Sequence, residues 1–172
     1  MIHFGVERGT VDPLPARPDL PRFDWRPFDS STESEFREVL KRTYEQSLDM
    51  PELDDVRSLD DIIAGHKALN RFEPSRWRLG RLPGEPKASA VILLAEVPDK
   101  PAWEVAYLGL TPEARGRGLG RAALSHARDL AAREVGRLEL AVDARNAPAD
   151  RLYRSAGFTA FDRRAVHLTI LR

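Results

Sequence analysis

The sequence predicts an α+β domain whose elements follow the order βααβββαβαβ. Three apolar runs, Trp77–Leu82, Ala88–Val97 and Trp103–Leu110, are separated by short Pro- and Gly-containing segments. This pattern is typical of an antiparallel meander. A long helix is expected next, because apolar residues between Gly118 and Val135 recur with a period near 3.6.

Two helices precede the meander. Phe23–Phe28 is expected to form a short first strand, and the segment from Asp29 to Glu33 offers a helix N-cap with acidic residues in the first turn. That helix is expected to run to about Leu48. A capping box over 58–61 (Ser-Leu-Asp-Asp) opens a second helix, which is expected to continue to about Leu69.

The C-terminal third alternates between strand and helix. Leu138–Val142 is expected to be a strand, and Ala147–Ala156 a short helix that Gly157 ends. Phe158–Leu171 is expected to supply one or two terminal strands. The strands of the meander are joined by short turns, so the sheet is expected to be mostly antiparallel, with helices flanking it.

The 172 residues are enough for one domain with a sizeable core. Five of the 13 prolines fall between Pro13 and Pro27, so residues 1–21 are expected to be an extended N-terminal lead-in. Residues 22–172 are expected to form a single domain.

Composition excludes several classes of function. The 27 basic residues balance the 27 acidic ones, so no overall field attracts nucleic acid or an anionic membrane. The longest apolar run, Ala90–Ala95, is far shorter than the ~20 residues of a membrane span, and no secretory signal opens the chain, so we expect a cytoplasmic protein. The absence of cysteine excludes disulfides, thiolate metal sites and a cysteine acyl-enzyme.

The segment from Leu108 to Arg121 contains a candidate phosphate site. Gly116, Gly118 and Gly120 lie at the entry to the long helix, where backbone N–H groups approach a ligand closely and the helix dipole adds positive potential. Three arginines add donors that match phosphate geometry: Arg115, Arg117 and Arg121. The alternative interpretation is a Gly-rich turn with solvated arginines.

Two other nucleotide-binding patterns compete for these glycines. The run Gly118-x-Gly120-x-x-Ala123, with Asp143 at a strand end, satisfies a dinucleotide fingerprint. However, the chain ends too soon after Asp143 to complete a doubly wound sheet, and the preceding strands lack crossover helices. A Walker loop needs a Gly-Lys-Ser/Thr triplet, which the sequence does not contain.

A second motif runs from Asn146 to Phe158 and reads Asn-x-x-Ala-x-x-Leu-Tyr-x-x-x-Gly-Phe. Together with the Arg-x-x-Gly-x-Gly loop over 115–120, it resembles the GNAT superfamily of N-acetyltransferases. The resemblance is strong from Trp77 to Phe158 and compatible before that. It implies a mixed sheet whose fourth and fifth strands separate, with acetyl-CoA between them as the co-substrate.

The resemblance also implies roles for individual residues. Main-chain groups of Leu108 and Leu110 would bind the pantetheine arm, as in strand addition. The Asn146 side chain would contact the cofactor from the other side. Backbone amides of the loop would hold the pyrophosphate, which makes the loop residues cofactor-binding candidates: Arg115, Gly116, Arg117, Gly118, Leu119, Gly120 and Arg121.

Two residues are candidates for proton transfer. Tyr153 occupies the position of the family's general acid and would protonate the departing thiolate; the alternative is a packing role on a short helix. Glu104 occupies the general-base position of the histone-acetylating branch, and strand alternation predicts that it shares a face with Ala106 and Leu108. The alternatives to Glu104 are water as the base and a solvated strand-end charge.

The loop after the first helix is acidic, with Asp49, Glu52, Asp54 and Asp55. In the resembled fold this connection borders the acceptor site, so the loop would favour a cationic amine; a solvated surface loop is the alternative. The four histidines show no metal-ligand spacing, and no metal site is expected. His126 lies on the apolar face of the long helix and is expected to be a hydrogen-bonded, semi-buried residue.

The sequence thus resembles an acyl-CoA-dependent N-acyltransferase. The resemblance implies a transfer of acetyl to a primary amine of a small molecule or a peptide. A non-catalytic sensor that binds coenzyme A or acyl-CoA has the same cradle and stays an alternative. A nucleic-acid binder is disfavoured by the zero net charge. Residues 1–10 and the terminal strands could pair with a second chain, so a homodimer stays open.

Overall fold

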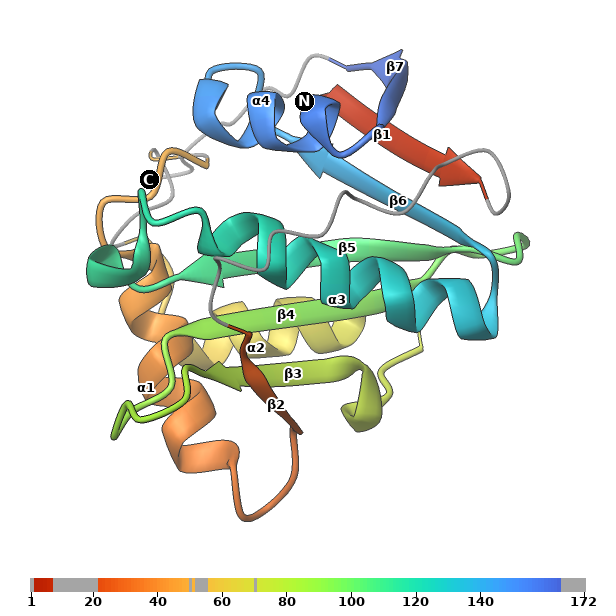
Figure 1. Cartoon of the computed structure of the whole chain (residues 1–172). Coiled ribbons are helices and arrows are strands. Elements are labelled where there is room, and N and C mark those ends of the chain that lie inside the picture. The colour runs from red at the N-terminus through yellow and green to blue at the C-terminus, as the bar shows by residue number, and fades with distance from the viewer. Residues whose placement is uncertain (1, 8–21, 50, 52–55, 70, 165–172) are drawn as a thin grey trace.

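The computed structural model describes residues 2–7, 22–49, 51, 56–69 and 71–164. A seven-stranded sheet with the order β2-β3-β4-β5-β6-β1-β7 forms its centre (Figure 1). The strands are β1 (Ile2–Glu7), β2 (Asp24–Pro27), β3 (Trp77–Arg81), β4 (Ala90–Glu96), β5 (Trp103–Leu110), β6 (Arg137–Val142) and β7 (Thr159–Arg163).

Helices cover both faces of the sheet. The helices α1 (Glu33–Tyr44) and α2 (Leu59–Ala68) pack on one face, and α3 (Leu119–Glu134) and α4 (Ala147–Ser155) on the other (Figure 1). Two 3-10 turns, η2 (Pro74–Arg76) and η3 (Pro112–Ala114), precede β3 and α3. No helix within the described ranges combines the length and apolar character that crossing a bilayer requires.

From β2 to β7 the structure confirms the predicted order βααβββαβαβ. The capping box of α2 is also confirmed, because the Ser58 side chain accepts from the Asp61 N–H and the Asp61 side chain accepts from the Ser58 N–H. The expected lead-in is wrong in one part. Ile2–Glu7 forms β1, which lies between β6 and β7 and pairs antiparallel with both. β1 could not be predicted from its own residues, because it becomes a strand through pairing with segments far along the chain.

The parallel pairing of β5 with β6 is short. It joins Trp103 to Leu138, Glu104 to Glu139 and Val105 to Leu140, while β5 continues to Leu110. Beyond Val105, β6 runs away from β5 toward α4 (Figure 1). We call residues 106–110 of β5 the open edge, because no described strand pairs with it on the β6 side.

A β-bulge lies where the two strands separate. The β4 partners of β5 change register between Leu93, which pairs with Tyr107, and Leu94, which pairs with Val105, so Ala106 is the extra residue. Consequently Ala106 and Tyr107 both pack on the α1 and α2 face, whereas Leu108 packs on the α3 face. The predicted alternation is therefore corrected: Glu104 shares its face with Ala106 but not with Leu108.

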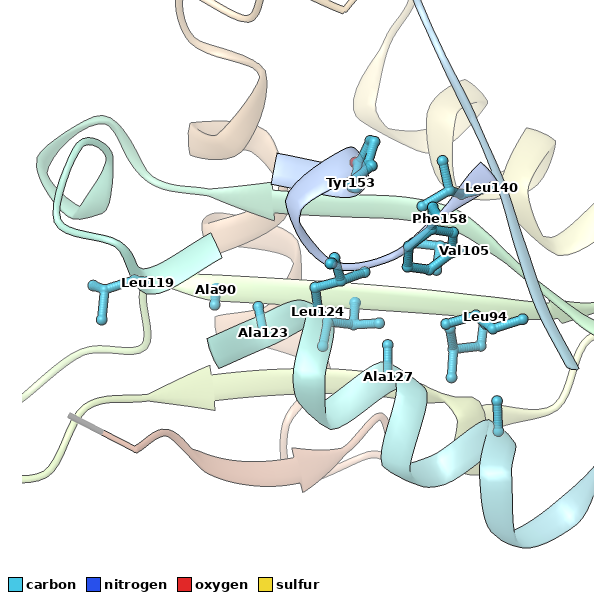
Figure 2. Packing of buried hydrophobic residues seen from close by; sticks show 14 of the residues in the cluster. Ala90, Leu94, Val105, Leu119, Ala123, Leu124, Ala127, Leu140, Tyr153 and Phe158 are labelled. Atoms are coloured by element: carbon cyan, nitrogen blue, oxygen red, sulfur yellow. The ribbon is translucent and has the colours of Figure 1, made fainter. Parts of the chain in front are cut away.

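The core has two parts, one on each face of the sheet. Figure 2 shows the part under α3, where Ala123, Leu124 and Ala127 point toward the strands. Tyr153 of α4 and Phe158 complete this part beside Val105 of β5. The core thereby holds both α3 and α4 against the strand that has the open edge.

Candidate active site

The open edge of β5 directs main-chain groups away from β4. Thr111 donates its N–H to the Ser89 carbonyl at 3.0 Å, so residues 107, 109 and 111 face β4 by the period of two. Leu108 and Leu110 therefore point their N–H and C=O groups toward the separating β6. The Leu110 carbonyl accepts from Arg115 Nε at 3.1 Å. The main-chain N–H and C=O of Leu108 and the N–H of Leu110 are therefore the groups that suit an extended ligand.

Glycines shape the loop between η3 and α3. Gly116 and Gly118 have φ of +70° and +74°, a left-handed conformation that side chains disfavour. Gly118 is the N-cap of α3, and it supplies no side-chain cap for the first-turn N–H groups. Those amides and the dipole of a 16-residue helix form a site that favours an anion. Leu119 is fully buried and anchors this end of α3 in the core.

The other side of the α3 N-terminus contacts α4. A Cβ on Gly120 would lie 3.1 Å from Leu152 Cδ2, so this glycine also allows the two helices to approach closely. The Arg121 side chain donates to Ser155 Oγ at 2.8 Å. Arg121 thus joins α3 to α4, which differs from the phosphate contact predicted for it.

The Arg115 side chain is directed toward protein carbonyls. Its Nη2 donates to Thr43 O at 2.9 Å, its Nη1 to Glu45 O at 2.7 Å and Gln46 O at 3.2 Å, and its Nε to Leu110 O. A guanidinium has five N–H donors, so these four acceptors occupy nearly all of them. The structure therefore gives this side chain a different role from the predicted phosphate donor.

Arg117 alone among the three arginines keeps the predicted geometry. It is exposed, and no hydrogen bond or ion pair joins its side chain to the described residues. It lies between the two left-handed glycines, beside the uncapped N-terminus of α3. Arg117 is therefore the arginine of this loop whose phosphate contact stays a prediction.

Asn146 caps α4. Its Oδ1 accepts from the Ala149 N–H at 3.3 Å, and Pro148 follows in the first turn. The residue thus orients the helix that contains Tyr153. A direct contact between its side-chain amide and the cofactor stays a prediction.

Tyr153 is buried between α4 and the sheet, 8% exposed, and its ring lies 6.1 Å from that of Phe158. Burial raises the pKa of its phenol, and the negative charge of Asp49 raises that pKa further. The phenol therefore stays protonated at neutral pH, as a proton donor requires.

Glu104 lies in the part of β5 that pairs with β6, two residues before the bulge. Its register partner is Glu139, which is buried and accepts from Arg137 Nε at 2.7 Å. The half-buried Glu104 carboxylate lies on the face that α1 and α2 cover. It is thus on the opposite face from α3 and near the start of the open edge, as a proton acceptor on the acceptor side would be.

Asp49 comes from the loop after α1 and reaches the end of β6. Its Oδ1 accepts from the Asp143 N–H at 3.3 Å. Partial burial and the nearby Asp143 charge raise its pKa, and its own charge acts on the phenols of both Tyr107 and Tyr153. The other three predicted acceptor residues, Glu52, Asp54 and Asp55, lie outside the described residues.

Sequence reasoning missed a cluster of polar and aromatic side chains on the same face. The Thr43 hydroxyl lies 3.0 Å from the Tyr107 hydroxyl, Tyr44 stacks on Tyr107 at 4.9 Å, and the Tyr44 hydroxyl lies 3.1 Å from His66 Nε2. Burial lowers the pKa of His66 to about 4, so its ring is neutral at pH 7. These residues come from α1, α2 and β5, and no spacing along the chain could have joined them.

Asp143 was also missed as a site residue. Its buried carboxylate accepts from Arg145 Nη2 at 2.6 Å and from the Arg145 N–H at 2.8 Å, so a cation neutralises it. Asp49 has no such cation among the described residues. Nowhere in the part of the chain that the structure describes do three His, Asp or Glu residues gather as metal ligands would.

Curated relatives match between about a third and a half of the chain. Six match, each named a mycothiol acetyltransferase. The protein from Beutenbergia cavernae is 45% identical over 89 residues, which are 51% of this chain and 30% of that protein. The chain therefore aligns with less than a third of the length of this relative.

Solved structures share the fold over most of the chain. A GCN5-related N-acetyltransferase from Sphaerobacter thermophilus superposes with a TM-score of 0.69 at 21% identity, over 93% of this chain and 48% of that one. The yncA protein from Salmonella typhimurium, solved with its cofactor acetyl-CoA, has a TM-score of 0.56 at 19% identity, over 80% of both chains.

The acetyltransferase (GNAT) family matches residues 25–158, from β2 to the residue before β7. This range contains the open edge, the glycine loop, α4 and Tyr153. Because the match covers well over half of the chain, the chain belongs to the GNAT acetyltransferase family.

Proposed function

We propose that this acetyltransferase moves acetyl from acetyl-CoA directly to a primary amine. The observation that supports the proposal most is the open edge of β5, which directs the main-chain groups of Leu108 and Leu110 toward the side of β5 from which β6 separates, and Tyr153 packs in the same core part as these two residues. The uncapped N-terminus of α3 lies at one end of this edge, and Glu104 at the other. Phosphate, thioester and amine would thus lie in that order along one strand.

The chemistry follows from this order. Loop amides and Arg117 hold the pyrophosphate of acetyl-CoA, and strand amides hold its pantetheine arm. The neutral amine attacks the thioester carbonyl, so a C–N bond forms and the C–S bond breaks. Tyr153 gives its proton to the departing thiolate. Before the attack, the bound ammonium gives one proton to Glu104 or to water. The second proton, which the nitrogen loses as the amide forms, passes to solvent, and solvent returns a proton to Tyr153.

The Glu104 role is supported by its place on the acceptor face. The register partner of Glu104 is Glu139, whose carboxylate lies 2.7 Å from Arg137 Nε and 4.0 Å from Lys100 Nζ. A carboxylate at the position of Glu104 can accept the proton that the attacking amine gives up.

The acceptor is proposed to be cationic before it reacts, because no cation of the described residues neutralises the Asp49 carboxylate on the acceptor side. The named relatives make the acceptor of mycothiol acetyltransferases one member of the panel to assay. The panel is completed by four compounds that carry a primary amine in different chemical surroundings: spermidine, glucosamine, free lysine and a peptide with an N-terminal alanine.

Turnover of acetyl-CoA with this panel tests the proposal, and Tyr153→Phe tests its mechanism. Loss of the hydroxyl should lower kcat by about 10² while the affinity for acetyl-CoA and the unfolding temperature change little. Tyr44→Phe is the matched control, because it removes a phenolic hydroxyl that contacts His66 and should lower kcat far less. Near wild-type kcat in Tyr153→Phe would refute the acid role.

A second experiment distinguishes an enzyme from a sensor that only binds acetyl-CoA. Gly118→Val places a β-branched residue at φ +74° and should weaken acetyl-CoA binding by about 10², measured by calorimetry. Tight acetyl-CoA binding by the wild type without turnover of any amine in the panel would favour the sensor. Unchanged affinity in Gly118→Val would overturn the phosphate cradle.

A further inference from the structure

Arg115 connects the cofactor loop to the end of α1. The last carbonyls of a helix have no partner within it. Thr43 lies in the last turn of α1, Glu45 is its C-cap and Gln46 follows the cap. Arg115 Nη1 and Nη2 donate to all three carbonyls, at 2.7 to 3.2 Å. One side chain from the loop that precedes α3 therefore completes the C-terminus of a helix on the opposite face.

This contact fixes the start of the segment that follows α1. Gln46 adopts φ +54°, which is unfavourable for a residue with a side chain and is held by its surroundings. Three residues later, Asp49 receives a hydrogen bond from the Asp143 N–H at the end of β6. The segment from Gln46 to Asp49 is thus fixed at two points, one of which is the Arg115 guanidinium.

This arrangement fixes the position of the Asp49 carboxylate. Its carboxylate has one described hydrogen-bond donor and no neutralising cation among the described residues. Its charge acts on Tyr107, at the bulge, and on Tyr153, the proposed acid. A carboxylate that the loop after α1 places at the end of β6 suits an ammonium group that approaches the reacting thioester from the α1 side.

We propose that Arg115 is a positioning residue for the acceptor: it holds Asp49 to bind the cationic amine, and it couples acceptor binding to occupancy of the cofactor loop. The inference rests on the proposed transfer to an amine. Gly116 to Gly120, directly after Arg115, would close on the pyrophosphate. In this proposal, the bound pyrophosphate restricts the loop further and strengthens the Arg115 contacts, and linkage then requires each ligand to raise the affinity for the other.

The central test is a comparison of Arg115→Met with Arg117→Met. Arg115→Met should raise KM for the best amine of the panel about tenfold or more and leave the Kd of acetyl-CoA within about twofold. Arg117→Met should do the reverse, because Arg117 is exposed beside the glycines and has no described protein partner. Weakened acetyl-CoA binding with an unchanged amine KM in Arg115→Met would overturn the proposal.

A double-mutant cycle distinguishes positioning from general stability. Asp49→Asn keeps the shape of the side chain and an acceptor for the Asp143 N–H, and it should raise the amine KM about tenfold. Adding Arg115→Met to Asp49→Asn should raise KM little further, since both variants remove the same contact. Fully multiplicative effects of the two substitutions would overturn the proposal.

Hydrogen exchange provides a readout that needs no turnover. Acetyl-CoA should slow amide exchange at residues 43–49 of the wild type, and this protection should be lost in Arg115→Lys, whose ammonium cannot meet four carbonyls in a planar fork. Absence of protection in the wild type, or equal protection in both proteins, would overturn the coupling. If no amine is acetylated while the protection appears, the proposed function fails and the coupling is retained.

Discussion

The two faces of the sheet differ in how their side chains are organised. Under α3, small and aliphatic residues such as Ala123, Leu124 and Leu94 pack densely, and the ligand groups are main-chain amides. On the α1 and α2 face, aromatic and polar side chains meet: Phe36 stacks on Trp77 at 5.6 Å, and Tyr107 contacts Thr43 and Tyr44.

This difference separates the two halves of the proposed reaction. A cofactor that is the same in every turnover can be held by backbone geometry, which glycines and a helix N-terminus provide. An acceptor must be recognised by side chains, because these differ in charge and shape. In the proposed reaction, the α3 face therefore binds the cofactor and the α1 and α2 face recognises the acceptor.

The largest expected effect comes from Leu93 and Leu94, neighbours in β4 that point to opposite faces. Each is fully buried, so Leu93→Ala and Leu94→Ala should each lower the free energy of unfolding by about 3 kcal/mol. Leu93 pairs with Tyr107 and should affect mainly the amine KM, whereas Leu94→Ala should affect mainly acetyl-CoA affinity. Equal effects of both variants on both ligands would show that the faces are not separable.

Gly109→Ala tests the α1 and α2 face alone. A Cβ there would lie 2.6 Å from Tyr107 Cε1 and 2.7 Å from Thr43 Cβ, so the ring must move. Overpacking of this kind should cost about 2 kcal/mol in urea unfolding and raise the amine KM. Acetyl-CoA affinity should stay close to the wild-type value, and a similar loss of affinity for both ligands would contradict the comparison.

The pH dependence of stability should involve both faces. Burial lowers the pKa of His66 on one face and of His126 on the other to about 4, below the ~6.5 of an unfolded histidine. The unfolded chain therefore binds more protons between these values, so the free energy of unfolding should fall as the pH drops from about 6.5 to about 4.

His126→Phe should flatten that slope. Phenylalanine keeps the stacking on Trp25, at 4.8 Å in the wild type, and removes Nε2, a buried ring nitrogen with no hydrogen-bond partner among the described residues. This missing partner corrects the expectation of a hydrogen-bonded His126. Urea midpoints measured at several pH values provide the test, and an unaltered slope would assign the acid sensitivity to His66 and the carboxylates.

The smallest effect is expected at Gly65 in α2, where a Cβ meets nothing within 4 Å. Gly65→Ala should stabilise the protein by about 0.5–1 kcal/mol, because alanine loses less backbone entropy in a helix. Gly84→Ala is the matched control, since a Cβ there also meets nothing, yet its φ of +82° makes alanine strained and destabilising. Thermal unfolding of the two variants should therefore shift in opposite directions.

Much of the fold was predictable because local signals are strong in this chain. The Pro and Gly turns around the meander, the apolar period of α3 and the capping box of α2 each depend on residues close together in the sequence. The glycine loop was predictable for the same reason, since left-handed positions at a helix entry require glycine. β1 was not, because its six residues become a strand through pairing with β6 and β7 at the other end of the chain.

The sequence by itself determined the elements from β2 to β7, which backbone amides are candidates for holding a phosphate, and which tyrosine lies in the α4 motif. The tertiary structure decided what the charged side chains do. Arg115 and Arg117 are two residues apart in one motif, yet Arg115 reaches the carbonyls of α1 while Arg117 faces solvent. The physical reason is that a guanidinium satisfies whichever acceptors lie around it, and those acceptors belong to segments about 70 residues away along the chain.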